Sequence, residues 1–307
     1  MSQTIPLWKA EHAVTGALAK KLIDAQFPQL APAVIEFLGK GYDNTVFLVN
    51  QNYVFRFPRR QIAVKLLKTE LRLLPVLAGV LPLPTGIPLF ADKSAPGLYP
   101  WPFAGYTLIA GQPAGRLPIS AREKAAPQLA AFLRVLHQFD PQQAQLLGAP
   151  EDSFARLDID RRRPALLKQI DQLERFELYP HSEVLRRFVK EMESCPLSGK
   201  KCLVHGDLHP RNLLFDEQQR MTGVIDWGDL HIGDPAIDLS IAYSFLSKKS
   251  RTIFFSHYGP ITPDARYLAK WKAVFTETSL LTYAWDIKDK ELLAATQESL
   301  DLALGLK

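Results

Sequence analysis

Three oxygen-bearing side chains, Asp207, Asn212 and Asp226, have the types and spacing that could bind a metal and move a proton. The apolar runs at residues 213–215 and 224–225 flank a polar turn, which is a pattern typical of a β-hairpin. Such a hairpin would bring the three side chains to one of its ends. Mg²⁺ prefers oxygen ligands of this kind and is usually bound by one or two protein carboxylates together with substrate phosphates.

The spacing from Asp207 to Asn212 equals that of the catalytic loop in kinases. In that loop the aspartate accepts or orients the proton of the attacking hydroxyl, the asparagine holds metal, and a later aspartate links metal to the phosphates. The pattern therefore predicts phosphoryl transfer to a hydroxyl. Two alternatives stay open, namely a polar hairpin whose acids are incidental and a metal-dependent hydrolase, although two carboxylates and an amide make a sparse hydrolase site.

A glycine-containing loop upstream is the candidate phosphate-binding element. Gly39 and Gly41 lie between the β-rich runs at residues 34–38 and 46–49, and Asn44 stands where the kinase pattern has a third glycine. Glycines there would let backbone N–H groups approach phosphates closely. Strands on both sides disfavour a dinucleotide-binding crossover, which needs a helix next. An ordinary hairpin turn is the alternative.

The next strand, predicted over residues 53–57, supplies a cation. Alternation places Arg56 on the face opposite its two phenylalanine neighbours. Glu70, on a helix predicted over residues 62–74 and ended by Pro75, is its natural partner. We expect Arg56 to bind phosphate, with a geometry different from that of lysine because its guanidinium is a planar fork. An ordinary exposed arginine is the alternative.

Prolines concentrated between Pro75 and Pro118, closing in the segment 105–111, indicate a domain boundary. We predict domains at residues 1–105 and 106–307. The first reads as a small sheet with an internal helix, preceded by a helix over residues 13–27. The second reads as mainly helical, with a helical tail over residues 266–304, so the predicted class is α+β.

Composition excludes several classes of protein. The 307 residues are 47% hydrophobic and 22% charged, and no apolar run reaches the length of a membrane span. Two cysteines, Cys195 and Cys202, argue against a disulfide scaffold and a cysteine-rich zinc site, and without a leader pattern we expect a cytoplasmic protein. The net charge is +5, and no nucleic-acid-binding motif is found. Nothing in the sequence indicates an oligomeric state.

Together these segments resemble the aminoglycoside phosphotransferase and choline kinase superfamily. The resemblance rests on residues 39–60, 105–111 and 205–238. It implies a protein-kinase-like fold of two lobes, a small antiparallel-sheet N-lobe with one packed helix and a larger, mainly helical C-lobe. Residues 41–44 and 105–111 look most like enzymes that modify the 2″-hydroxyl of aminoglycosides, and residues 55–59 also resemble macrolide phosphotransferases.

The resemblance implies a role for each candidate residue. It makes Asp207 the catalytic base, Asn212 and Asp226 the magnesium ligands, and the Arg56–Glu70 pair a replacement for the family's nucleotide-binding Lys–Glu pair. The segment 105–111 becomes a hinge, where backbone groups of Thr107 and Ile109 pair with the purine of ATP or GTP. It also gives His205 and Asp238 a structural role in holding the catalytic loop. His209 would either reach the γ-phosphate or face solvent.

The acceptor is the least constrained part of the prediction. Residues 205–240 hold seven acids and two Lys/Arg, which favours a cationic acceptor such as an aminoglycoside, and hence antibiotic resistance, although bound magnesium would offset that charge. A macrolide, a neutral sugar or an amino alcohol stays open. A catalytically silent nucleotide-binding relative is the rival reading, motivated by the arginine at position 56.

Overall fold

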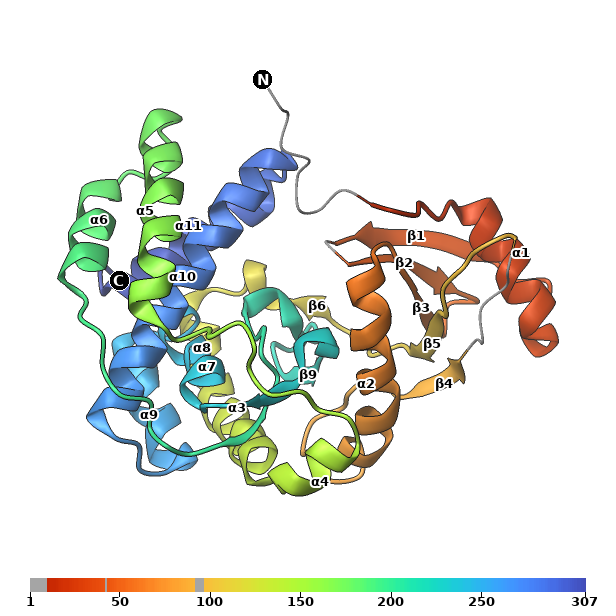
Figure 1. Ribbon diagram of the computed structural model, residues 1–307, viewed down its shortest axis with the longest axis horizontal. Helices are drawn as coiled ribbons and strands as arrows, with labels where there is room; N and C mark the ends of the chain where they lie inside the picture. The colour runs from red at the N-terminus through yellow and green to blue at the C-terminus, as the bar shows by residue number, and fades with distance from the viewer. Residues whose placement is uncertain (1–9, 42, 92–96) are drawn as a thin grey trace. The chain divides into compact units, whose positions relative to one another are not determined.

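The computed structural model describes residues 10–41, 43–91 and 97–307 (Figure 1). Tyr42, part of the segment 41–44 that carries the family resemblance, lies outside the described residues. The chain divides into two compact units. The first holds the described residues up to Val80 and those from Pro84 to Ile109, and the second holds Leu81–Leu83 and Ala110–Lys307.

The first unit is built on a five-stranded sheet in which all neighbouring strands are antiparallel, in the order β1-β2-β3-β5-β4. The strands are β1 (Ile35–Lys40), β2 (Asn44–Val49), β3 (Tyr53–Pro58), β4 (Pro88–Ala91) and β5 (Ala104–Thr107). The domain boundary predicted after residue 105 would cut β5, whose last residue, Thr107, still pairs with Tyr53. The division observed in the structure falls after Ile109 instead.

The core of this unit is aromatic. Phe55 and Phe57, on one face of β3, are fully buried, and Phe57 stacks on Phe103 with ring centroids 4.5 Å apart. Arg56 lies on the other face of the strand, as its alternation predicts. Helix α1 (Gly16–Gln26) begins at Thr15, whose hydroxyl accepts a hydrogen bond from the Leu18 N–H (3.2 Å).

Helix α2 (Gln61–Leu77) does not end before Pro75, so the predicted end at residue 74 is wrong. Proline lacks an N–H donor, so Pro75 removes one hydrogen bond from the helix. Pro75 lies in the last turn, and the helix ends two residues later at Leu77. The N–H of Ala78 still donates to the Leu74 carbonyl at 2.8 Å, which carries the last turn past the proline.

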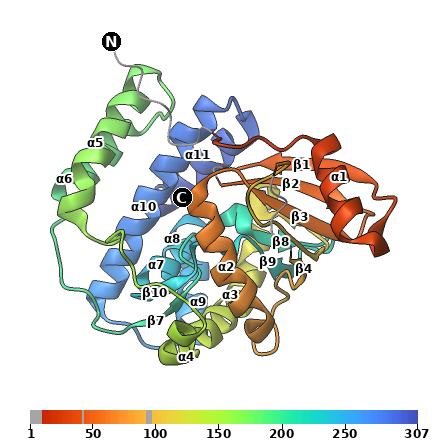
Figure 2. The same cartoon turned by 45° about the vertical axis from the view of Figure 1, so that its right-hand side comes forward.

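The second unit is mainly helical, as expected, and in Figures 1 and 2 α5 lies beside α6 and α10 beside α11. Its helices are α3 (Ile119–Gln138), α4 (Pro141–Leu146), α5 (Ile159–Arg175), α6 (Ser182–Glu191), α7 (Ala236–Leu239), α8 (Ile241–Ser244), α9 (Lys248–Tyr258), α10 (Pro263–Asp286) and α11 (Lys290–Leu304). The α+β class is confirmed.

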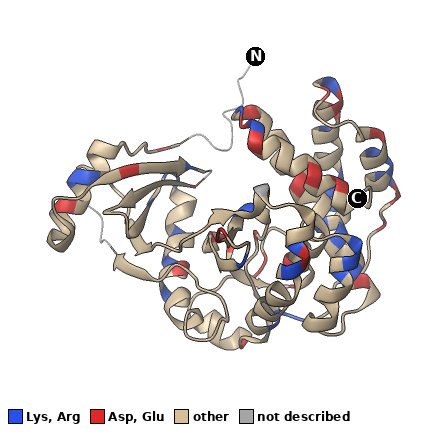
Figure 3. Ribbon diagram, turned by 180° about the vertical axis from the view of Figure 1, so that it is seen from behind, with Lys and Arg blue, Asp and Glu red and all other residues tan. Residues whose placement is uncertain are grey.

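The predicted continuous helix over residues 266–304 is two helices. Lys288 has a left-handed φ of 60°, and the Asp289 side chain accepts a hydrogen bond from the Leu292 N–H (2.9 Å), which begins α11. Among the described helices, none is both long and apolar enough to cross a bilayer. Figure 3 shows basic and acidic positions interspersed along the helices of this unit.

Two short sheets lie among these helices. One pairs β7 (Cys202–Val204) with β10 (His231–Gly233), and the other has the order β6-β8-β9, formed by β6 (Gln112–Pro113), β8 (Leu213–Phe215) and β9 (Met221–Val224). The pairing of β8 with β9 confirms the predicted hairpin. Short 3₁₀ turns lie at Pro28–Leu30, Ala114–Arg116, Pro210–Asn212 and Trp227–Asp229.

Candidate active site

The β8–β9 hairpin brings Asn212 and Asp226 together. Leu213 pairs with Val224 across the hairpin, and beyond this pair the N–H of Ile225 donates to the Asn212 carbonyl at 3.0 Å. Asp226 follows directly and has left-handed backbone angles (φ 65°, ψ 63°). The sequence predicts both residues at one end of a hairpin, and in the structure they lie there.

Asp207 is tied to Asn212 through the backbone. The Asn212 Nδ2 donates to the Asp207 carbonyl at 2.8 Å, and Asn212 is buried. Because the amide nitrogen is used in this way, the side-chain oxygen is the atom left for a cation. The donor chemistry of Asn212 and Asp226 therefore fits Mg²⁺.

His209 lies next to this pair, with its Nε2 3.8 Å from the Asp207 Oδ2. The imidazole is buried, and burial lowers the pKa of His209 to about 3, so the ring is neutral near pH 7. The sequence left open whether His209 faces the γ-phosphate or solvent, and its burial argues against solvent.

Asp238 holds the loop that carries Asp207. Its carboxylate is fully buried and accepts hydrogen bonds from the backbone N–H groups of His205 (2.7 Å) and Gly206 (2.9 Å) and lies 3.1 Å from the His137 Nε2. Burial alone would raise the pKa of Asp238, but the His137 hydrogen bond, the charges of both histidines and the backbone donors together lower it. His205 in turn places its Nε2 3.0 Å from the Ile225 carbonyl, next to Asp226.

Gly206 has no room for a side chain. Its φ is 87°, and a Cβ placed there would lie 2.2 Å from the Asp229 carbonyl oxygen. Only glycine adopts this conformation without strain and also permits such a close approach. The residue before Asp207 is therefore fixed by packing as well as by the Asp238 carboxylate.

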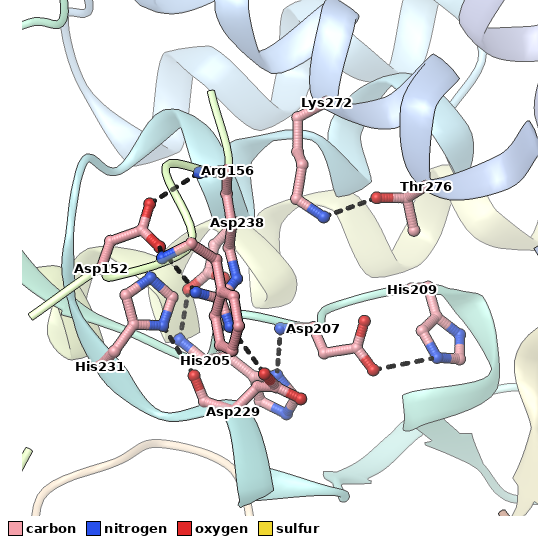
Figure 4. Close-up of polar contacts among 12 residues, drawn as sticks. Asp152, Arg156, His205, Asp207, His209, Asp229, His231, Asp238, Lys272 and Thr276 are labelled. Atoms are coloured by element: carbon pink, nitrogen blue, oxygen red, sulfur yellow. Dashed lines mark hydrogen bonds and ion pairs between the residues drawn. The ribbon is translucent and has the colours of Figure 1, made fainter. Parts of the chain in front are cut away.

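The Asp207 carboxylate lies among charges of both signs (Figure 4). The side chain keeps 41% of its exposure, yet the surrounding protein displaces enough water to raise the pKa of Asp207, and the charges of Asp229 and Asp226 raise it further. Lys272 and Arg156 oppose this rise. The balance favours a carboxyl that takes up a proton more readily than an ordinary aspartate.

Two basic residues near Asp207 were missed by the sequence analysis. Arg156 forms ion pairs with Asp152 and Asp229, both at 2.7 Å. Lys272, on α10, is buried and donates to the Thr276 hydroxyl at 2.6 Å, and burial lowers its pKa. Neither belongs to a local motif, because they reach the loop from segments about 50 residues before it and about 65 after it in the chain.

No group of three or more His, Cys, Asp and Glu side chains within the described ranges is arranged to hold a metal by itself. A cation bound by Asn212 and Asp226 would therefore need further oxygen ligands. Phosphates and water commonly supply these to Mg²⁺.

In the first unit, Arg56 and Glu70 form the predicted pair. The Arg56 Nη1 lies 2.6 Å from the Glu70 Oε1, with side-chain exposures of 14% and 4%. The Arg56 guanidinium carbon also lies 6.0 Å from the centre of the Tyr106 ring. A nearly buried ion pair fixes the guanidinium in position on β3.

Packing does not require glycine at Gly39, which lies within β1 opposite Val46 and not in a loop as predicted, or at Gly41, which follows the strand. A Cβ at Gly39 or at Gly41 would meet no heavy atom within 4 Å. The Gly41 N–H donates to the Asn44 carbonyl at 3.0 Å, and Asn44 begins β2 opposite Pro58. This open backbone suits the close approach of an anion that the sequence analysis predicted.

The predicted hinge residues lie at the end of β5. The Thr107 N–H donates to the Ile87 carbonyl (3.0 Å), and its hydroxyl accepts from the Ile87 N–H (3.1 Å). The Thr107 N–H is thus used inside the unit, and pairing of backbone groups near Thr107 and Ile109 with the base stays a prediction. Ile109, half-buried, follows the last strand residue by two positions.

Comparison with known proteins shows to which family the chain belongs. The model of the phosphotransferase enzyme family, APH, matches residues 34–280, which is more than half of the chain. The chain belongs to this family. Among curated proteins, an uncharacterized protein of Bacillus subtilis, YcbJ, is 29% identical over 106 residues, and viomycin phosphotransferase of Streptomyces vinaceus is 40% identical over 73 residues. These matches span 34% and 25% of the two proteins' lengths.

Solved structures of phosphotransferases match over nearly the whole chain. The GDP complex of aminoglycoside 2'-phosphotransferase-IIIa is 25% identical, with a TM-score of 0.70, covering 95% of this chain and 99% of that one. A GDP and kanamycin complex of an APH(2″) enzyme is 27% identical, with a TM-score of 0.68 and coverages of 93% and 97%. Macrolide 2'-phosphotransferase MphH from Brachybacterium faecium, 21% identical over 91% and 98% of the two chains, shares the fold with a TM-score of 0.57. The kinase-like class predicted for this family member is confirmed.

Proposed function

We propose that this phosphotransferase-family chain moves the γ-phosphoryl group of ATP or GTP to a hydroxyl of a small acceptor, in a magnesium-dependent reaction. The observation that carries the proposal is the joint placement of Asp207, Asn212 and Asp226, which the β8–β9 hairpin and the Asn212 Nδ2 hydrogen bond bring together. A catalytically silent relative would have no use for this set of a base and two oxygen ligands.

Asp207 is proposed to accept the proton of the acceptor hydroxyl as the oxygen attacks phosphorus. Its raised pKa supports this role, because a base works best when its pKa approaches the working pH. Asp238, Gly206 and Asn212 hold the backbone of the loop, so the carboxylate is positioned before the acceptor arrives. Asn212 and Asp226 would hold the magnesium ion, which when bound neutralises charge on the phosphates.

Arg56 is proposed to bind phosphate oxygens of the nucleotide. Glu70 fixes the guanidinium on β3, and its planar, permanently charged fork matches the geometry of phosphate oxygens. The open backbone at Gly39 and Gly41, and backbone groups at Thr107 and Ile109, are proposed to bind the phosphates and the base. Because the two structural relatives at 25% and 27% identity are GDP complexes, GTP is tested beside ATP.

An aminoglycoside-like acceptor is the first candidate. The kanamycin complex of one relative and the excess of acids over bases in residues 205–240 support it. A macrolide, a sugar or an amino alcohol is the second group to test. A cytoplasmic setting and a role in antibiotic resistance remain predictions.

The test is a coupled phosphotransfer assay with aminoglycosides, macrolides, choline and small sugars, run with each triphosphate and with and without Mg²⁺. Asp207→Ala should lower turnover by at least about 10²-fold while nucleotide still binds. Glu217→Ala, an exposed acid in the turn of the same hairpin, should leave turnover unchanged. Turnover retained by Asp207→Ala would refute the role of Asp207. Absence of both transfer and Mg²⁺-dependent nucleotide hydrolysis in the wild type would favour a silent relative.

A further inference from the structure

A cavity lies in the helical unit, between α9 and the first turns of α10. Its volume is about 570 Å³, which lies within the roughly 300–1,000 Å³ typical of small-molecule sites. None of its lining residues belongs to the proposed phosphotransfer site. The lining residues that matter below are Tyr243, Lys248, Arg251, Phe255, Pro260 and Arg266.

The charge of this cavity has one sign. Lys248, Arg251 and Arg266 line it, and its lining contains no Asp or Glu. Two acids belong to neighbouring sites instead. Asp264 lines a different hollow beside Cys195, and Glu123 forms an ion pair with Lys249 at 2.8 Å. Three positive charges are therefore concentrated at a concave surface without acidic residues to balance them there.

The two guanidinium groups are held by aromatic rings. The guanidinium carbon of Arg251 lies 5.0 Å from the centre of the Tyr243 ring, and that of Arg266 lies 4.2 Å from the centre of the Phe255 ring. The two ring centroids are 6.3 Å apart and the rings are inclined by 55°, so the two cations are held by neighbouring rings, here called the aromatic floor. A guanidinium that is already held over an aromatic ring loses less freedom when its N–H groups bind an oxyanion.

We propose that this cavity binds the phosphate group of a small organic phosphate, with Arg251 and Arg266 as its principal ligands. A phosphate monoester carries close to two negative charges and several acceptor oxygens, which suits two guanidinium groups and an ammonium better than a single carboxylate does. The aromatic floor and Pro260 provide contact for an apolar body attached to the phosphate. The proposal is independent of the phosphotransfer reaction.

The probe is phenyl phosphate, titrated calorimetrically into the full chain without nucleotide, because ADP or GDP is itself an organic phosphate and would compete for the cavity. The same titration into Arg56→Gln, in the proposed nucleotide site, should give the wild-type affinity. Arg251→Gln and Arg266→Gln should each weaken binding at least about tenfold, because each removes charge-assisted hydrogen bonds. Lys249→Gln is the matched control, because Lys249 is a cation on α9 that pairs with Glu123 and does not line the cavity. This variant should change the affinity for phenyl phosphate less than about twofold.

Inorganic phosphate and benzoate separate the contributions of the anion and of the ring. We expect phosphate to compete with phenyl phosphate and benzoate to bind more weakly. Thermal unfolding confirms that each variant is folded, and two independent arginine variants guard against loss of structure in one of them. The proposal is overturned if both variants bind as the wild type does, if phenyl phosphate produces no binding heat, or if benzoate binds as tightly.

Discussion

Two loops of this protein are held in different ways. In the helical unit the loop before Asp207 is fixed by a fully buried carboxylate, Asp238, that accepts two of its backbone N–H groups, and Gly206 is packed under a carbonyl oxygen. In the sheet unit the end of β1 and the loop after it, with Gly39 and Gly41, have open space where side chains would be. The first loop is positioned by contacts, whereas the second is shaped by the lack of side chains, so substitutions should affect stability in one and ligand affinity in the other.

Removing the Asp238 carboxylate should have the largest effect. Asp238→Ala leaves two buried backbone N–H groups and His137 without their acceptor, so we expect a loss of about 3–5 kcal/mol in the free energy of unfolding. Urea unfolding followed by circular dichroism measures it. Asp238→Asn keeps one acceptor oxygen and should lose less. A change of less than about 1 kcal/mol for the alanine variant would show that the loop is held by other contacts.

The sheet unit also contains one tightly held group, and the second prediction concerns it. Arg56→Ala removes the guanidinium from the buried Glu70 and should cost about 3 kcal/mol of stability, because a buried carboxylate loses the opposite charge 2.6 Å away. Arg56→Lys keeps the charge and should cost less. Lys65→Ala, an exposed cation on α2, is the control. Equal unfolding free energies for Arg56→Ala and Lys65→Ala would contradict the prediction.

Burial of the Glu277 carboxyl in the helical unit makes the free energy of unfolding depend on pH. Burial raises the pKa of this carboxyl from 4.5 to about 8, although Ser244, Lys272 and Arg122 lower it in part. The folded state therefore keeps a proton that the unfolded state loses, so this residue's contribution to stability declines as pH rises from about 4.5 to about 8.

Glu277→Gln should remove that decline. We expect the variant to unfold with nearly the wild-type free energy at about pH 4.5 and to be more stable than the wild type by about 3–5 kcal/mol at about pH 9. Urea unfolding at the two pH values measures the difference. The same difference at both values would mean that Glu277 does not titrate in this range.

The smallest effect on stability is expected in the glycine loop. Gly41→Ala adds a methyl group to open space, so the free energy of unfolding should change by less than about 0.5 kcal/mol, while the KM for nucleotide should rise several-fold if phosphates approach this backbone. Gly206→Ala is the counterpart in the fixed loop and should destabilise the fold. An unchanged KM for Gly41→Ala would separate the loop from nucleotide binding.

Sequence patterns predicted those parts of the site whose partners are close in the chain or follow a period. The β8–β9 hairpin and the Arg56–Glu70 pair were predicted in this way, since alternation and spacing constrain them. Arg156 and Lys272 were not, because long-range packing places them near Asp207 and no local pattern marks them. The break before α11 did have a signal: Asp289 is a typical N-cap residue, and its position within an apolar periodicity hid it.

The backbone at Asp226 restricts which residues could ever serve in its place. Left-handed angles are readily adopted by glycine, asparagine and aspartate, and strain most longer or branched side chains. Glutamate, which offers the same carboxylate one carbon further out, is thus disfavoured by the main chain before any ligand is considered. Attempts to retune this position by directed evolution would have to work through asparagine or first remodel the turn that follows β9.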